Sequence, residues 1–217
     1  MKNTVIFDLD GTLLHTLNDL ADSVNFALDT CNYPKRTLEE IRTFVGNGVK
    51  ILITKSVPIG TDNKKIEMCL NIFKNHYSKN MQNKTNPYDG ILELLSYLKE
   101  NNIKTAVVSN KFDTAVKALS NNYFGKLISV AVGENEKAGI AKKPAPDSVF
   151  AVLKLLNSKK DESIYVGDSE IDIKTAKNAG LISVGVTWGF RTREILINEG
   201  ANYIINTPKE LIKILNK

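Results

Sequence analysis

The chain has 217 residues, of which 42% are hydrophobic and 24% charged, and this composition excludes a disordered chain or a fibrous repeat. Its length suits one α/β domain, or a core domain that carries a smaller insert. The 29 basic and 24 acidic residues give a net charge of +5, but the basic residues are mostly scattered lysines, so we expect no nucleic-acid partner.

Short apolar runs rich in β-branched residues predict buried parallel strands. The first run, residues 4–7 (TVIF), ends in acids and a glycine, as a strand followed by a loop would. Similar runs recur at 104–108, 127–132, 163–166, 181–186 and 203–205. Apolar residues at helical spacing lie between them, at 91–99, 114–121, 148–156, 171–179 and 210–215. This alternation predicts an α/β fold with a doubly wound parallel sheet.

The segment from residue 15 to residue 85 breaks this alternation. It shows helical periodicity without a convincing strand, and turn-rich breaks fall at 32–34 and 58–63. We therefore predict an all-helical insert, 15–85, after the first strand, and an α/β core made of residues 1–14 and 86–217.

Cysteine usage and hydropathy indicate the compartment. Two cysteines are too few for a disulfide framework, which favours a reducing environment. The N-terminus meets an acid at Asp8, so it carries no signal-peptide apolar stretch, and no 18-residue apolar run follows later. We expect a cytoplasmic protein with no membrane partner.

The first motif that carries chemistry is DLDGT, at the end of the first predicted strand. If the strand continues, the carboxylates of Asp8 and Asp10 point the same way, and Gly11 lets the backbone turn before Thr12. Taken alone, the motif would equally suit a solvated turn.

Two further motifs also follow predicted strands or turns. Ser109 and Asn110 offer a hydroxyl, an amide and backbone N–H groups suited to an anion, although such residues are also common helix caps. In KKPAP, at 142–146, two prolines stiffen the backbone behind Lys143. The alternative there is a rigid helix entry with a surface lysine.

The fourth motif, GDSEID at 167–172, places Asp168 and Asp172 at the start of a predicted helix. Acids in a first helical turn can simply complement the helix dipole. If this strand neighbours the first one, however, several carboxylates meet at one rim and need a cation. Oxygen ligands without a histidine or cysteine cluster favour Mg²⁺.

The order and character of the four motifs resemble those of the haloacid dehalogenase-like superfamily of aspartate-nucleophile phosphohydrolases. The motifs are DLDGT, SN, KKPAP and GDSEID. The resemblance covers nearly the whole chain, and the helical insert looks like the small cap domain of that family. VGNG at 45–48 and SNKFD at 109–113 are similar to its phosphoglycolate phosphatase-like members. One departure is His15 after DGTLL, where relatives commonly carry an acid.

The resemblance implies a role for each motif residue. Asp8 would attack phosphorus to form an aspartyl-phosphate, and Asp10 would serve as acid and then as base. Lys143 would offset negative charge, while Ser109 and Asn110 would bind phosphoryl oxygens.

The resemblance also implies a metal site and its surroundings. Mg²⁺ would be held by the side chains of Asp8 and Asp168 and the carbonyl of Asp10. Thr12 and Asp172 would support the site from outside the metal's ligand set.

Substrate contacts are expected from the cap. His15 is a candidate because it follows the catalytic loop and its imidazole can bond a substrate oxygen, and the alternative is hinge packing. Around VGNG, the candidates are Arg42, Asn47 and Lys50, which could equally be solvated surface residues.

We predict a Mg²⁺-dependent phosphatase that acts on a small phosphorylated metabolite. The first candidate substrate is a phosphoglycolate-like acid, and the protein is expected to be a monomer or a homodimer. Alternatives are a phosphomutase of the β-phosphoglucomutase type and a pyrophosphatase. More remote is a non-catalytic sensor of a phosphorylated ligand, which would lack the nucleophile, the acid or the lysine. Asp10 and the metal-binding carboxylates argue against a haloacid dehalogenase activity on the same fold.

Overall fold

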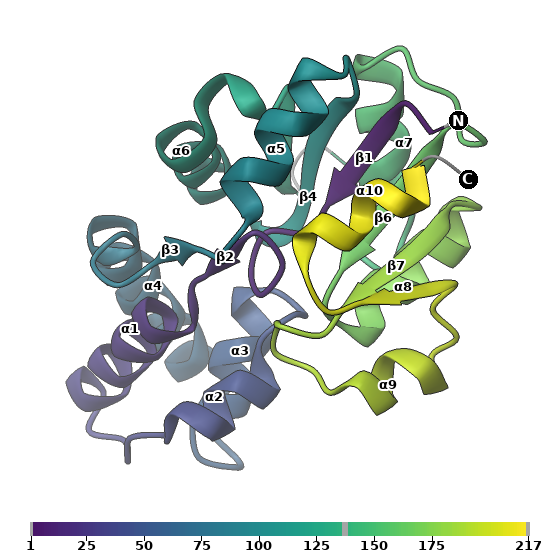
Figure 1. The fold of residues 1–217 in the computed structure, drawn as a ribbon. Helices are drawn as coiled ribbons and strands as arrows, with labels where there is room; N and C mark the ends of the chain where they lie inside the picture. The colour runs from purple at the N-terminus through teal and green to yellow at the C-terminus, as the bar shows by residue number, and fades with distance from the viewer. Residues whose placement is uncertain (1, 136–138, 216–217) are drawn as a thin grey trace. The chain divides into compact units, whose positions relative to one another are not determined.

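The computed structural model describes residues 2–135 and 139–215, and the chain divides into two compact units. Unit 1 comprises Met1–Leu14 and Pro87–Lys217, and unit 2 comprises His15–Asn86. The chain passes between them at two short paired strands, β2 (Leu14–His15) and β3 (Asn86–Pro87) (Figure 1). Among the described residues, no helix is long and apolar enough to cross a membrane.

Unit 1 is built on a sheet whose described strands run in the order β5-β4-β1-β6-β7-β8, with every neighbouring pair parallel. The strands are β1 (Thr4–Phe7), β4 (Lys104–Phe112), β5 (Val130–Glu134), β6 (Ser163–Gly167), β7 (Ile182–Val186) and β8 (Tyr203–Ile205). All residues of β1 and β6 are buried, as expected for central strands covered on both faces. The predicted doubly wound α/β fold is confirmed.

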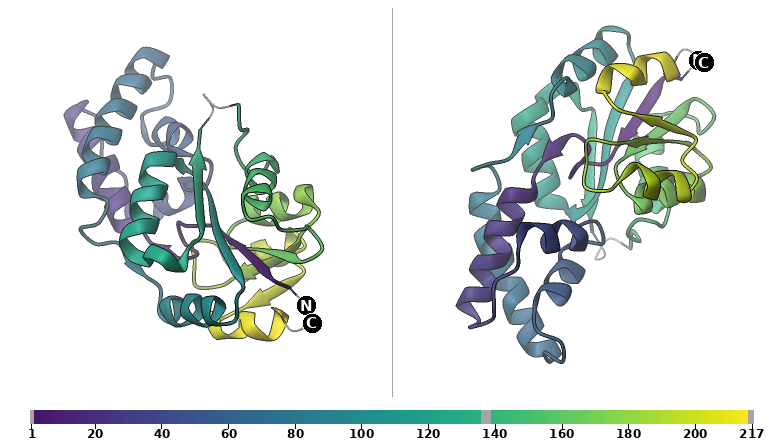
Figure 2. Two further views of the ribbon diagram at one scale, coloured as in Figure 1. Left: turned by 90° about the horizontal axis from the view of Figure 1, so that it is seen from above. Right: turned by 60° about the horizontal axis from the view of Figure 1, so that its bottom comes forward.

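Helices cover both faces of this sheet, and Figure 2 shows α7 and α8 on one face and α5 and α6 on the other. Ile6, Val108 and Tyr165 from the strands pack with apolar residues of α7 and α8 in one buried cluster. Among the residues of unit 1 that the structure describes, the helical segments are α5 (Ile91–Glu100), α6 (Asp113–Phe124), η1 (Gly125–Leu127), α7 (Asp147–Leu155), α8 (Glu170–Ala179), α9 (Arg193–Asn198), η3 (Pro208–Glu210) and α10 (Leu211–Leu215).

Two strands differ from their predicted bounds. The strand predicted at 127–132 begins at Val130, because α6 continues into the short helix η1 at the expected strand start. The strand predicted at 104–108 continues to Phe112. Its pairing with β5 is irregular beyond Val108, since β4 advances from Val108 to Phe112 while β5 advances only from Val132 to Glu134. Ser109, Asn110 and Lys111 therefore lie in a bulged stretch of β4.

Unit 2 is helical, with α1 (Leu17–Thr30), α2 (Leu38–Phe44), α3 (Val49–Ser56) and α4 (Asn63–Asn80). Apolar residues of α1 and α4 form its core, including the fully buried Val24, Phe73 and Tyr77. Thr37 and Glu40 form a capping box at the start of α2, and Asp62 caps α4. That this unit is a cap that supplies substrate contacts stays a prediction.

Candidate active site

The predicted site residues of unit 1 meet at the carboxyl edge of the sheet, where β1 and β6 end side by side and β4 runs alongside β1 in register. Phe7 pairs with Val107 of β4 and with Val166 of β6. Asp8 follows Phe7 directly, and Asp168 lies two residues beyond Val166. In an open parallel sheet this edge is where ligands bind.

The DLDGT motif forms a tight turn around Gly11. Gly11 has a φ of 85°, and its N–H donates to the carbonyl of Leu14 at 2.9 Å. A Cβ atom at this position would lie 2.4 Å from Oδ2 of Asp168, so both the backbone conformation and the close approach require glycine. The hydroxyl of Thr12 donates to Oδ1 of Asp168 at 3.2 Å. The turn thus places the first motif against the fourth.

Lys143 lies at the centre of the carboxylates. Its Nζ is 2.8 Å from Oδ1 of Asp8 and 2.8 Å from Oδ1 of Asp172, and it donates to the hydroxyl of Tyr165 at 3.1 Å. The side chain is only 3% exposed. Burial opposes its positive charge, but the carboxylates of Asp172 and Asp8 outweigh that effect, so the pKa of Lys143 is raised and the ammonium stays charged.

Asn110 holds the backbone of Lys143. Its Oδ1 accepts from the N–H of Lys143 at 2.9 Å, and its Nδ2 donates to the carbonyl of Lys143 at 3.0 Å. This side chain therefore positions the lysine, while the expectation that Asn110 binds phosphate stays a prediction. Ser109 is buried nearby in the chain, and its hydroxyl accepts from the N–H of Lys111 at 3.2 Å.

Lys111 is a site residue that sequence reasoning did not single out. Its Nζ lies 3.0 Å from Oδ2 of Asp10, and the two side chains are 2% and 12% exposed. The bulge in β4 carries this lysine toward the first motif. In the sequence it is one lysine among many, and only its place in the SNKFD segment could have drawn attention to it.

Asp172 is fully buried at the start of α8 and uses both of its oxygens. Its Oδ2 accepts from the N–H and the hydroxyl of Ser169 at 3.1 and 2.6 Å, which closes the helix with a capping box. Its Oδ1 faces Lys143 and the hydroxyl of Tyr165. That Asp172 supports the site from outside the metal's ligand set stays a prediction.

Asp168 is held by a neighbouring loop that the sequence did not reveal. The N–H of Phe190 donates to its Oδ2 at 2.7 Å. A Cβ atom on Gly189 would come within 2.2 Å of Cβ of Asp168 and 2.4 Å of the carbonyl oxygen of Gly11. Glycine at 189 thus lets this loop approach both the carboxylate and the turn.

The carboxylates of Asp8, Asp168 and Asp172 are buried and crowded, with ligand oxygens that all lie within 4.8 Å of one another. Burial and then the charge of Asp172 raise the pKa of Asp8 to about 7, although Lys143 opposes the shift. Burial and the charges of Asp172 and Asp8 also raise the pKa of Asp168 well above its usual range. Clustered carboxylates whose charges repel fit a hard divalent cation such as Mg²⁺.

The candidate substrate contacts of the helical segment lie in unit 2. His15 is half-buried in β2. Arg42 pairs with Glu39 at 2.6 Å, and Lys50 pairs with Glu67 at 2.8 Å, whereas Asn47 is half-buried. Each of these residues stays a predicted contact.

Comparison with known proteins agrees with this geometry. A phosphoglycolate phosphatase of Pseudomonas syringae pv. syringae is 30% identical over 98% of this chain and 79% of its own length. A protein of Caldanaerobacter subterraneus named "Putative pyrophosphatase PpaX" is 33% identical over 99% of this chain and 96% of its own. A crystal structure described as a "putative phosphoglycolate phosphatase" from Lactobacillus delbrueckii superposes with a TM-score of 0.93 at 34% identity, covering 99% of both chains.

A family model also matches most of the chain. It is that of the haloacid dehalogenase-like hydrolases, and the match runs over residues 5–186, from β1 to the end of β7. All four motifs fall within that range. The chain therefore belongs to the haloacid dehalogenase-like hydrolase family and is an enzyme of that family.

Proposed function

We propose that the protein is a Mg²⁺-dependent phosphatase that hydrolyses a small phosphorylated metabolite through an aspartyl-phosphate on Asp8. The observation that carries this proposal is the pairing of buried Asp8 with Lys143 beside Asp168 at the carboxyl edge of the sheet. A nucleophilic carboxylate, a fixed ammonium and a carboxylate cluster suited to a cation are the parts that phosphoryl transfer needs.

In the first step, a carboxylate oxygen of Asp8 would form a bond to phosphorus while the bond from phosphorus to the leaving oxygen breaks. Asp10 would give its proton to that leaving oxygen. In the second step, water would attack the phosphorus of the aspartyl-phosphate and pass a proton to Asp10, and the Asp8 carboxylate would be released. The ion pair with Lys111 fixes the position of the Asp10 carboxyl group, which a proton transfer to or from that group requires.

Lys143 would balance negative charge on Asp8 and on the transferring group, and burial strengthens this effect. Ser109 and backbone N–H groups of the bulged strand would bind phosphoryl oxygens, with Asn110 contributing through its hold on Lys143. The side chains of Asp8 and Asp168 and the carbonyl of Asp10 would hold Mg²⁺, which would neutralise charge on the phosphoryl oxygens.

For the substrate, we propose a phosphoglycolate-like acid first, on the basis of the Pseudomonas and Lactobacillus relatives. The Caldanaerobacter relative makes pyrophosphate the second candidate. The helical unit would act as the cap that selects the leaving group, with His15 as its first candidate contact. A cytoplasmic location belongs to the same proposal, and the presence of only two cysteines, too few for a disulfide framework, supports it.

The test is phosphate release from phosphoglycolate, sugar phosphates, pyrophosphate and an aryl phosphate, each with Mg²⁺ and with EDTA. We expect turnover that EDTA stops, with one substrate giving a kcat/KM well above the others. Asp8→Asn should abolish turnover while the protein stays folded. Near-normal turnover by Asp8→Asn would rule out Asp8 as the nucleophile. Full activity in EDTA would rule out a requirement for Mg²⁺.

A further inference from the structure

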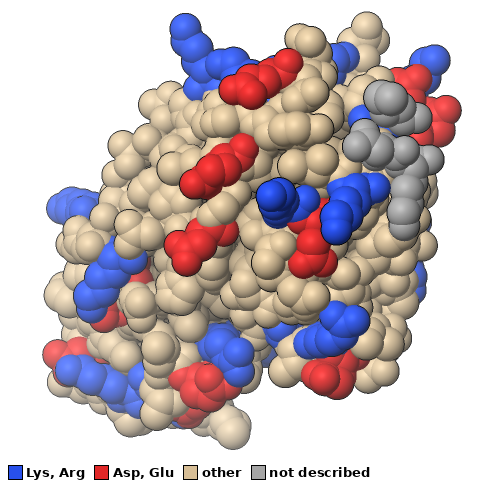
Figure 3. All heavy atoms as spheres, viewed as in Figure 1, with Lys and Arg blue, Asp and Glu red and all other residues tan. Residues whose placement is uncertain are grey.

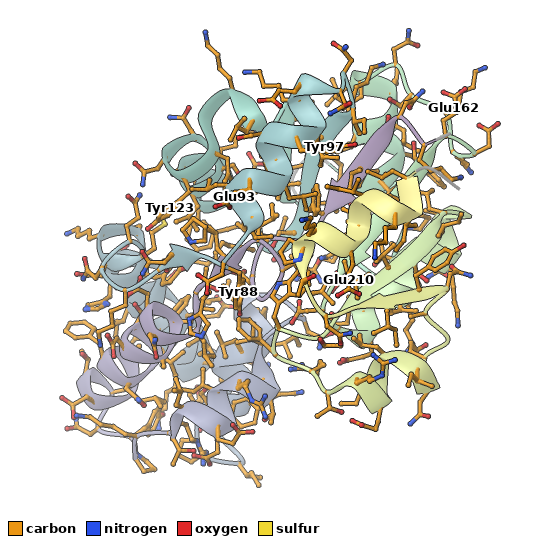
Figure 4. The ribbon with its side chains drawn as sticks, in the orientation of Figure 1. Tyr88, Glu93, Tyr97, Tyr123, Glu162 and Glu210 are labelled. Carbon is orange, nitrogen blue, oxygen red and sulfur yellow. The ribbon has the colours of Figure 1, made fainter. Side chains whose placement is uncertain are left out.

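A pocket of about 790 Å³ opens on unit 1 beside the turn that carries Thr12, which Trp188 in the pocket lining contacts. Its walls come from the start of α5, from the loop at Trp188 and from the segment 206–212. Figure 4 shows Tyr88, Glu93 and Tyr97 along α5 and the loop before it, and Glu210 on the C-terminal segment. This size is in the range of small-molecule sites, about 300–1,000 Å³.

The lining combines rings with negative charge. Tyr88, Tyr97 and Trp188 contribute three aromatic side chains, while Leu94 and Ile212 add apolar surface. Among the described lining residues the charged groups are Asp89, Glu93 and Lys209, so acids outnumber bases in a chain whose net charge is +5. Figure 3 shows acidic side chains over α5 on this face.

A further carboxylate, that of Glu210, contacts one of the lining residues. Oε1 of Glu210 accepts from the hydroxyl of Thr207, a lining residue, at 3.0 Å. Aromatic faces and carboxylates together attract an organic cation, whose ring packs on the rings while its ammonium pairs with the acids. An anionic ligand would meet like charge on Asp89 and Glu93.

The pocket is joined to the catalytic turn through two of its lining residues, Trp188 by its ring and Tyr88 by its backbone. Nε1 of Trp188 donates to the carbonyl of Thr12 at 3.0 Å, and the N–H of Tyr88 donates to the carbonyl of Leu13 at 3.1 Å. Thr12 in turn donates to Asp168. A ligand that displaces the Trp188 ring would therefore disturb Thr12, whose hydroxyl is hydrogen-bonded to the carboxylate of Asp168.

We propose that this pocket binds a small aromatic compound bearing a protonated amine, and that its occupancy reaches the catalytic turn through Trp188. None of the three carboxylates of the cluster lines this pocket. The proposal does not depend on which phosphate ester the enzyme hydrolyses.

Trp188 is the single tryptophan of the chain, so its indole N–H gives one resolved signal in the full-length ¹⁵N-labelled protein with Mg²⁺. The probes are phenethylammonium, neutral 2-phenylethanol and anionic 3-phenylpropionate. We expect a saturable shift of the indole signal, with phenethylammonium binding roughly three- to tenfold tighter than the alcohol and the carboxylate binding weakest. Equal or tighter binding of the alcohol or the carboxylate, or no saturable shift with any probe, would overturn the proposed ligand class.

Glu93→Gln keeps the shape of the side chain and removes one charge. We expect it to weaken phenethylammonium binding roughly two- to fivefold and to leave 2-phenylethanol unchanged. The matched control is Glu162→Gln, because Figure 4 shows Glu162 far from the pocket. Equal losses in both variants, or no loss in Glu93→Gln, would contradict the proposal.

The coupling is tested with Trp188→Phe, which keeps a ring but removes the N–H that reaches Thr12. In the native protein, phenethylammonium should shift the backbone amide signals of Gly11 and Leu13. In Trp188→Phe the amide signal of Gly90 should still report binding, while the shifts at Gly11 and Leu13 should fall at least severalfold. The proposed coupling between the pocket and the catalytic turn would be wrong if the Gly11 and Leu13 signals did not shift in the native protein, or if they shifted equally in Trp188→Phe.

Discussion

Asn110 holds the backbone of Lys143, a residue 33 positions further along the chain, with two hydrogen bonds. The side-chain oxygen of Asn110 accepts from the N–H of Lys143, and the side-chain nitrogen of Asn110 donates to the carbonyl of Lys143. The ammonium of the same lysine lies 2.8 Å from Asp8. The amide of Asn110 thus fixes where the positive charge of the site stands.

Replacing Asn110 by Asp keeps the size of the side chain but puts a carboxylate oxygen against the carbonyl of Lys143. We expect kcat to fall roughly 10- to 100-fold, because small displacements of a charge that acts on the reacting atoms are costly. The measurement is steady-state kinetics with an aryl phosphate. Thr114→Ala is the control, since Thr114 is exposed on α6, and its kcat should stay near the native value. An unchanged kcat in Asn110→Asp would show that the hydrogen bonds from Asn110 to Lys143 are unnecessary.

The raised pKa values of Asp8 and Asp168 predict how stability depends on pH. Each group binds its proton more tightly in the folded state, so its contribution to stability is complete below the unfolded pKa near 4 and is lost as pH rises through the folded pKa, about 7 for Asp8. The Tm of the metal-free protein should therefore fall between pH 5 and pH 8 because of these groups.

Mg²⁺ should reverse that loss, because it binds the ionised carboxylates and offsets their repulsion. We expect the Mg²⁺-induced rise in Tm to be larger at pH 8 than at pH 5.5, and Asp8→Asn to reduce it. Differential scanning fluorimetry at both pH values measures the effect. A Mg²⁺ response that is equal at the two pH values would contradict the placement of the metal at this cluster.

Gly189→Ala should weaken metal binding, because the added methyl would overlap Cβ of Asp168. Gly185→Ala is a matched control on β7: its Cβ would contact Leu196 at 3.1 Å and reaches no carboxylate of the cluster. Both variants should lose stability, whereas only Gly189→Ala should bind Mg²⁺ more weakly, by roughly 10-fold or more. Isothermal titration with Mg²⁺ distinguishes them, and equal affinities would count against the role of Gly189.

The sequence predicts the parts of this protein that depend on local pattern. The central strands are short apolar runs such as residues 4–7, and each motif of the site follows a strand end or a turn, so the sheet edge could be inferred. Other contacts depend on pairing across long separations. Local periodicity gives no signal of these contacts, which include the hydrogen bonds from Asn110 to Lys143, the ion pair of Lys111 with Asp10 and the approach of the Gly189 loop.

Asp19 shows the same limit in unit 2, where an acid on a helix is usually a solvated residue. It is only 1% exposed, and its carboxylate accepts from the N–H of Lys84 and from both the N–H and the hydroxyl of Thr85. Asp19 thus ties the end of the helical segment to α1.

Asp19→Ala should lower the free energy of unfolding by about 3 kcal/mol, because it leaves two backbone N–H groups without their acceptor. Asp22→Ala on the same helix is the control: it removes only an exposed ion pair with Lys84, a contact of 2.6 Å, and should cost less than about 1 kcal/mol. Urea unfolding compares the two. Similar losses in both variants would contradict this account of Asp19.

Asp8 should become phosphorylated during turnover, and this is tested by trapping the aspartyl-phosphate. The enzyme is mixed with its best substrate and Mg²⁺, quenched within the first turnover, and treated with borohydride, which reduces an aspartyl-phosphate to homoserine. Peptide mass spectrometry then locates the change, with Asp8→Asn as the blank. We predict homoserine at position 8 and at no other aspartate. An enzyme that releases phosphate while position 8 stays unmodified, or that carries the modification at Asp10 or Asp168, would contradict the account.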